Sequence, residues 1–247
     1  MDKNIKIKYH KWKYKEIKTL YSSCEKIIGI KENQIYQPYF SLYFHIHNTK
    51  KSHKLIDIDR RYFIKEITGI ISEKHHTSNT QLNCEVYDKR HNSVNNMELF
   101  CKCIPLLDPL YFMMNNYNNI IKRNPLLPSA YNYNTSSKIN NMNNNAYIDT
   151  FFSYISSELT LNNILPSFPI YYGSLNGINK QFNYDITDDY SNLRDEEWFY
   201  KNLGKNYKID MYVDSDDDDD DSDDDDSDEP QSSDGHESND DEPQSDE

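Results

Sequence analysis

Glycine is scarce in this sequence, with six residues in 247. The pattern G-x-G-x-x-G does not occur, and Gly69 stands alone in the part of the chain where strands are expected. Glycine-rich loops bind phosphates through closely spaced backbone N–H groups, because glycine lets the chain approach a ligand. The sequence therefore lacks a glycine-rich phosphate-binding loop.

Long apolar runs and a cysteine framework are also missing. No apolar run approaches the roughly 20 residues that span a bilayer. The charged N-terminus lacks the apolar core of about 7–15 residues found in signal peptides. The four cysteines do not have the spacing of a disulfide scaffold in a chain of this length. We therefore expect an intracellular protein in a reducing compartment that is not secreted.

Charge is divided unevenly along the chain. Of 41 acidic residues, 20 lie at 214–247, which contain no lysine or arginine. The remaining residues, 1–213, hold 21 acidic and 27 basic side chains and carry a formal charge of +6. The segment 214–247 cannot bury enough apolar area to offset the entropy of ordering, so we expect a disordered tail. We expect two further regions, an N-terminal extension at 1–59 and a folded domain at 60–213.

The N-terminal extension is rich in lysine and aromatic residues. Seven lysines fall within residues 3–18, around Trp12. Such a segment either binds an acidic partner or nucleic acid, or forms the solvated face of a strand or helix. The solvated face is the ordinary interpretation, and we do not expect nucleic-acid binding. Short alternating runs between 34 and 58 predict strands.

Three later segments predict an antiparallel hairpin and a preceding strand. Residues 61–72, which contain Gly69, predict a strand and a turn. Residues 82–88 and 97–106 alternate between apolar and polar positions on either side of a polar turn at 89–96. The alternation places Leu82, Cys84 and Val86 on one face.

The second arm of this hairpin carries a lysine between apolar residues. Period-two alternation sends Phe100, Lys102 and Ile104 to one face, and Leu99, Cys101 and Cys103 to the other. A lysine in that setting is either an ordinary edge-strand residue or a charge that needs an acidic partner. A zinc site would combine Cys101 and Cys103 with Cys84 and with either His75-His76 or His45-x-His47. These residues do not form a compact ligand set, which favours buried free thiols.

The region from 146 to 177 predicts a helix that leads into a strand. An asparagine among 143–145 supplies the helix N-cap, and Pro166 lies just past the helix end. Residues 168–173 then predict a short aromatic strand that ends at Gly173. Apolar residues at helical spacing predict the buried stripe of the helix: Ile148, Phe151, Phe152, Ile155 and Leu159.

Two more helices are expected. Residues 108–123 predict one helix, with Asp108 as its N-cap and Pro109 at its first position. Residues 193–203 predict another, which Gly204 ends. Together with the strands, these helices predict an α+β fold in which an antiparallel sheet packs against one prominent helix.

The order of these elements carries a family resemblance. The stretches FCKCIPLLDPLYFM (100–113), NNAYIDTFFSYISSEL (144–159) and PSFPIYYGSLNGI (166–178) resemble the amino-terminal part of serine/threonine protein kinases of giant DNA viruses. The resemblance covers roughly residues 60–210, and the abundance of Asn, Ile, Lys and Tyr agrees with an AT-rich viral genome. It implies a kinase-like small lobe, and a viral protein of the host cytoplasm or the virion.

The resemblance implies a nucleotide-binding role for a few residues. Lys102 would contact the phosphates of ATP, and Asp149 or Glu158 on the helix would hold it in place, as a carboxylate does in protein kinases. Asp149 is slightly favoured, because Phe151, Phe152 and Ile155 are expected to turn that part of the helix inward. Gly69 would stand in the strand that covers the phosphates, and ATP with Mg²⁺ would be the cofactors.

The chain departs from the family in its catalytic parts. Sequences resembling H-R-D…N or D-F-G are absent from the 247 residues, so the chain has neither the catalytic base nor the metal-binding aspartate of a kinase. Phe100 also replaces the small residue expected two positions before the lysine. We therefore expect no catalytic residues and no metal ligands in this chain, and phosphoryl transfer only if a large lobe is supplied elsewhere. A fragment, a split gene and a degenerate copy all fit this pattern.

The acidic tail at 214–247 predicts an alternative, non-enzymatic function for this chain. A segment with 20 acidic residues would bind basic proteins by charge, and five serines directly before acidic residues offer sites where phosphorylation would add more negative charge. The alternative is a non-enzymatic interaction protein with a basic body and an acidic tail. The plain interpretation of such a tail is a solubilising spacer. The sequence does not indicate an oligomeric state.

Overall fold

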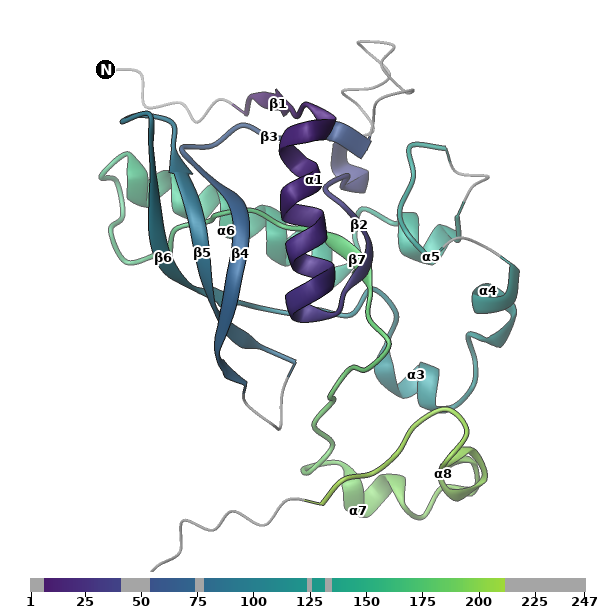
Figure 1. Ribbon diagram of the computed structural model, residues 1–247. Helices are drawn as coiled ribbons and strands as arrows, with labels where there is room; N and C mark the ends of the chain where they lie inside the picture. Colours follow the sequence, from purple (N-terminus) through teal and green to yellow (C-terminus); the bar gives the residue numbers. More distant parts are fainter. Residues whose placement is uncertain (1–6, 41–53, 74–77, 124–125, 132–134, 212–247) are drawn as a thin grey trace, which may run out of the picture. The chain divides into compact units, whose positions relative to one another are not determined.

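The computed structural model describes residues 7–40, 54–73, 78–123, 126–131 and 135–211 (Figure 1). The chain divides into two units, Met1–Asp210 and Met211–Glu247. The expected boundary between 59 and 60 lies inside the first unit, and the expected tail at 214–247 lies outside the described residues. The first unit mixes antiparallel sheets with several helices, so the predicted α+β class is confirmed.

A three-stranded antiparallel sheet is the largest element. It consists of β4 (Tyr62–Glu73), β5 (Thr80–Asp88) and β6 (Ser93–Cys101), in that order. The predicted hairpin between the last two strands is confirmed, and its second arm starts and ends earlier than expected. Alternate side chains of β5 are buried, as predicted: Leu82, Cys84 and Val86.

Gly69 does not form the expected turn. It lies within β4 opposite Asn83, next to an irregularity in the register after Ile67. Its backbone does not adopt a positive φ, and a Cβ added there would meet no atom within 4 Å. The expectation of a turn was therefore wrong, because β4 continues past this glycine and pairs with β5 as far as Glu73.

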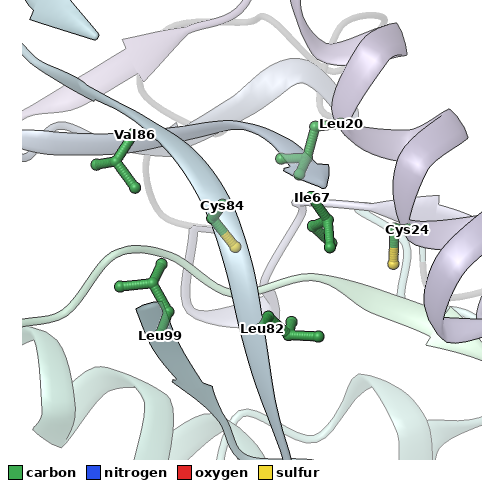
Figure 2. Close-up of a cluster of buried hydrophobic side chains, with 7 residues drawn as sticks. All are labelled: Leu20, Cys24, Ile67, Leu82, Cys84, Val86 and Leu99. Atoms are coloured by element: carbon green, nitrogen blue, oxygen red, sulfur yellow. The ribbon is translucent and has the colours of Figure 1, made fainter. Parts of the chain in front are cut away.

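Helix α1 (Tyr14–Ser23) and the π-helical turn that follows it, Cys24–Ile28, pack against this sheet. The Ser23 hydroxyl accepts a hydrogen bond from the backbone N–H of Ile67 at 3.0 Å, which ties the helix end to β4. Figure 2 shows the buried cluster between them: Leu20, Cys24, Ile67, Leu82, Cys84, Val86 and Leu99. Residues before position 59 therefore contribute to the same core as the sheet.

The lysine-rich segment lies at the surface, with its tryptophan inward. Strand β1 (Tyr9–Lys11) pairs with β3 (Ile56–Ile58), and Trp12 follows with only 3% of its surface exposed. Five of the seven lysines fall within the described residues, and all five are exposed: Lys8, Lys11, Lys13, Lys15 and Lys18. The exposure of these lysines agrees with a solvated face.

The strands expected between 34 and 58 are present in part. Strand β3 and the end of β2 (Lys31–Gln34) fall in this range, and a 3-10 turn forms at Pro38–Phe40. Residues 41–53 lie outside the described part of the chain.

Helix α6 (Asn145–Leu161) begins as predicted. The side chain of Asn144 accepts a hydrogen bond from the backbone N–H of Ala146 and caps the helix. The predicted stripe is right only in part: Phe151 and Ile155 pack against a buried cluster, whereas Ile148 and Phe152 are 52% and 62% exposed. The fully buried residues of the helix are not part of that stripe: Ala146, Tyr147, Tyr154, Ser156 and Ser157. Apolar and aromatic residues occur on more than one side of α6, so spacing alone did not select the buried side.

The strand predicted at 168–173 is absent. Its backbone groups bind side chains instead of a neighbouring strand: the N–H of Tyr171 donates to Ser157 Oγ, and the carbonyl of Tyr172 accepts from Arg60. The strand forms slightly later, as β7 (Asn176–Ile178), which pairs with β2. Residues 168–173 therefore do not pair as a strand, because side chains distant in sequence bind their backbone groups. The sequence pattern does not reveal these hydrogen bonds.

The remaining helices are short. The single helix expected at 108–123 is divided into α3 (Pro109–Met113) and α4 (Asn118–Arg123), because Asn115 between them has a φ of 67°. The predicted N-cap is confirmed, since Asp108 accepts from two backbone N–H groups of α3. The described residues beyond α4 form further short helices at α5 (Ser137–Asn140), α7 (Tyr190–Leu193) and α8 (Glu197–Asn202). The helix predicted at 193–203 corresponds to α8, and Gly204 follows it with a φ of 76°.

Candidate functional site

Lys102 and Asp149 form an ion pair. Lys102 lies just after the last residue of β6, and Asp149 lies near the N-terminus of α6. The Lys102 Nζ atom is 2.7 Å from Asp149 Oδ1. The structure therefore brings together the lysine and the favoured carboxylate, which are 47 residues apart in sequence.

This ion pair is accessible to solvent. The side chains of Lys102 and Asp149 are 54% and 39% exposed. An ion pair at that exposure contributes up to about 1 kcal/mol to stability, so it is a weak structural element. An ammonium group has three donors, and one hydrogen bond to Asp149 leaves others for an anionic ligand.

Glu158 is not the partner of Lys102. It lies nine residues further along α6, and its carboxyl group is partly buried. Burial, and then the nearby charge of Asp59, raise the pKa of Glu158 above its ordinary value. The structure thus decides between the two carboxylates that the sequence left open, in favour of Asp149.

Gly69 and Phe100 do not complete a nucleotide site around this pair. Gly69 of β4 lies opposite Asn83 of β5, and Asn83 lies opposite Glu98 of β6, so Gly69 is level with Glu98 across the sheet. Glu98 is four residues before Lys102, which corresponds to about 13 Å along a strand. Phe100 is 64% exposed on the side of β6 that faces away from the core. A recess of about 410 Å³ lies between α1 and β2, and neither Lys102 nor Asp149 lines it.

The cysteines are not arranged as a metal site. In the described part of the chain, no group of three or more Cys, His, Asp or Glu side chains could hold a metal ion. Burial raises the pKa of Cys24 to about 12 and of Cys84 and Cys101 to about 11, which favours the neutral thiol. Cys24 and Cys84 are buried free thiols. The histidines at 45, 47, 75 and 76 lie outside the described residues.

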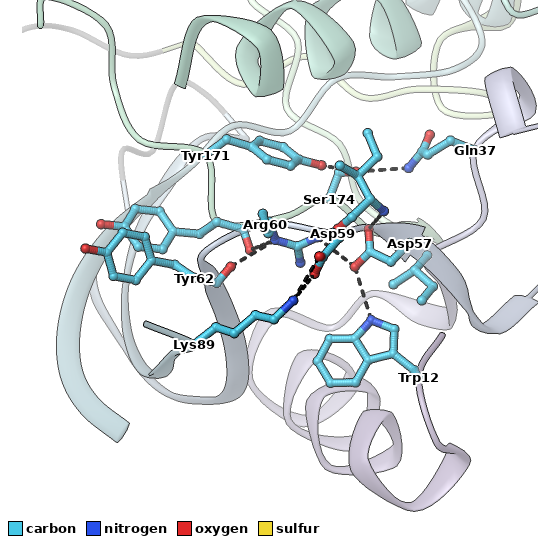
Figure 3. Close-up of polar contacts among 12 residues, drawn as sticks. Trp12, Gln37, Asp57, Asp59, Arg60, Tyr62, Lys89, Tyr171 and Ser174 are labelled. Atoms are coloured by element: carbon cyan, nitrogen blue, oxygen red, sulfur yellow. Dashed lines mark hydrogen bonds and ion pairs between the residues drawn. The ribbon is translucent and has the colours of Figure 1, made fainter. Parts of the chain in front are cut away.

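A buried ion pair that the sequence did not predict joins Arg60 to Asp57 (Figure 3). Their closest atoms are 2.8 Å apart, and both side chains are at most 5% exposed. The indole N–H of Trp12 donates a second hydrogen bond to the Asp57 carboxylate, at 3.1 Å. Burying two charges is costly unless further hydrogen bonds satisfy them, and this pair has several.

The guanidinium of Arg60 connects three segments. Its Nε donates to the carbonyls of Tyr62 in β4 and Tyr172 after α6, and its Nη1 donates to the carbonyl of Ile58 in β3. It also lies over the ring of Phe63, 4.5 Å from the centroid. These contacts join the guanidinium to β3, β4 and the segment after α6, so the group holds these parts of the fold together.

Further polar contacts lie on two sides of this network (Figure 3). Lys89 Nζ lies 2.7 Å from Asp59 Oδ1, in an ion pair that is more exposed than that of Arg60. On the other side, Gln37 donates to Ser174 Oγ, which also accepts from the Tyr171 hydroxyl. The run Asp57-Ile58-Asp59-Arg60, with two carboxylates beside an arginine, is a sequence signal that could have pointed to an ion pair here, but not to the backbone carbonyls that Arg60 binds.

Comparisons with protein-family models, curated proteins and solved structures found no match to this chain. Within the described residues, no helix has both the length and the apolar character that crossing a membrane requires.

Proposed function

We propose that residues 60–210 are the small-lobe part of a protein-kinase-like protein, in which Lys102 contacts the phosphates of ATP and Asp149 holds it in position. The observation that carries this proposal is the 2.7 Å contact between the two side chains. In protein kinases a strand lysine binds the nucleotide phosphates, and a carboxylate from the following helix pairs with it.

The order of the elements supports the same proposal. Three antiparallel strands precede Lys102, and the first long helix after it supplies the carboxylate. The chain lacks the catalytic and metal-binding aspartates of a kinase. Phosphoryl transfer from ATP to serine or threonine would therefore need a large lobe that holds Mg²⁺ and supplies the base.

Thermal unfolding of the full chain with Mg-ATP tests this proposal. Wild type should melt at a higher temperature with millimolar Mg-ATP, because a ligand that binds only the folded state stabilises it. Lys102→Met should abolish most of the shift, since it removes the ammonium group that binds phosphate. The melting temperature without nucleotide should change little, because the ion pair is exposed.

Lys138→Met is the matched control for this substitution, since Lys138 is an exposed lysine on α5. It should leave the shift with Mg-ATP unchanged. If wild type shows no shift with Mg-ATP, or if the two lysine variants behave alike, the nucleotide-binding role of Lys102 is refuted.

The charge distribution favours a second candidate function, a non-enzymatic protein whose acidic tail binds basic proteins. Residues 214–247 carry a formal charge of −20, and the rest of the chain carries +6. A tail of that charge density attracts cationic partners at low ionic strength, and salt screens the attraction.

Capture on immobilised poly-lysine tests the second candidate. The full chain should bind at low salt and dissociate as salt is added. A chain that ends at residue 213 should lose binding, because its formal charge is positive. Equal capture of the truncated and full chains would contradict this function.

A further inference from the structure

Strand β6 forms an open edge of the main sheet. Within the described residues, β5 is its only pairing partner, and Figure 1 shows β6 as the outer strand. No other backbone hydrogen bond involves residues 93–101 in that part of the chain. The side of β6 away from β5 therefore presents a row of backbone N–H and C=O groups that can pair with another strand.

This edge lacks the features that usually prevent such pairing. Proteins protect exposed edges with bulges, prolines, lysines or a covering helix. The sequence of β6, SVNNMELFC, contains neither proline nor lysine, and its register with β5 is regular over all nine residues. The opposite edge strand, β4, contains Lys65, its register with β5 shifts in three places, and α1 packs on it.

The side chains of β6 add an apolar contribution at this edge. Val94 and Phe100 are 54% and 64% exposed, although both are large apolar residues. They lie six residues apart, so the alternation of the strand places them on the same face, away from the buried Leu99. Glu98 is the only charged residue of the strand.

We propose that β6 pairs with β6 of a second copy of this chain, antiparallel and around a two-fold axis through Met97. The two sheets would then form one continuous six-stranded sheet. In this register Val94 lies opposite Phe100 of the second copy, and Glu98 lies opposite Asn96 of the second copy. Each pair occurs twice because the interface is symmetric.

Self-pairing fits this strand better than an unrelated peptide does. The two exposed apolar residues lie at equal distances in sequence from Met97, so the two-fold axis brings them together. The same axis keeps Glu98 from facing its own copy, and like charges directly opposite each other destabilise a sheet. The inference holds whether or not the chain binds ATP.

Sedimentation of the full chain over a range of concentrations tests the pairing. Wild type should change from monomer to dimer as its concentration rises, at about 0.15 M and at about 0.5 M salt, where the charge of the tails is screened. Val94→Lys with Phe100→Lys places like charges opposite each other and should weaken dimerisation by about tenfold or more. Val94→Lys with Phe100→Glu places opposite charges in the same pairs and should retain dimerisation.

The two double variants form a matched pair, since both change the same two exposed positions. Equal melting temperatures would show that each remains folded. A wild-type chain that stays monomeric at every concentration would overturn the proposal. It would also fail if the Lys/Lys and Lys/Glu variants dimerise equally well, or if both are monomeric, because the register predicts that only the opposite charges allow pairing.

Discussion

Replacing Arg60 with methionine should lower the free energy of unfolding by about 3–5 kcal/mol, which urea denaturation would measure. Methionine keeps part of the apolar volume and removes the charge. The Asp57 carboxylate, which is 4% exposed, would then be buried without its main partner, and the carbonyls of Tyr62 and Tyr172 would each lose a donor. Breaking one side of a buried ion pair is far more costly than breaking an exposed one.

Lys89→Met is the control for this prediction. It removes the neighbouring ion pair with Asp59, in which the lysine is 50% exposed, and should cost less than about 1 kcal/mol. Asp57→Asn combined with Arg60→Met should be less destabilising than the sum of the two single changes, because it leaves no unpaired charge. A loss below about 1 kcal/mol for Arg60→Met would show that the pair does not stabilise the fold.

Replacing Gly173 with alanine should cost about 2–4 kcal/mol. Gly173 has a φ of 140°, which residues with a Cβ rarely adopt, and its new Cβ would lie 2.5 Å from Arg60 Nη2. The segment after α6 would have to move away from Arg60 and lose the hydrogen bond at Tyr172. Denaturant titration of the variant measures this loss.

Gly69→Ala is the matched control, because its φ is not positive and a Cβ there meets no atom within 4 Å. It should change stability by less than about 1 kcal/mol. In the Arg60→Met background the cost of Gly173→Ala should fall, since the guanidinium that the Cβ meets is gone. Equal costs in both backgrounds would contradict a steric conflict between position 173 and Arg60.

Local rules predicted much of the secondary structure. The alternation in β5 and the caps of α3 and α6 depend on residues close together in sequence, and the structure confirms them. The same rules failed at Asn115, where a left-handed residue divides the helix expected over 108–123. They also failed at 168–173, where side chains distant in sequence bind the backbone.

The candidate site was predictable only in part. The resemblance to kinases indicated Lys102 and two carboxylates, and the folded chain places Asp149 beside the lysine. The Arg60 network could not be derived from the sequence, because its carbonyl acceptors come from β3, β4 and the segment after α6. Which side of α6 is buried was also undetermined, since its apolar residues occupy more than one side.

The sequence by itself determined the charge division between body and tail, the alternation of the hairpin strands, and the helix caps, because each depends on composition or on neighbours a few residues apart. Only the tertiary structure decided which carboxylate meets Lys102, which residues surround Arg60, and which strand is left with an open edge. Those outcomes depend on contacts between segments far apart in the chain, and their free energies are set by burial and geometry that local sequence does not specify.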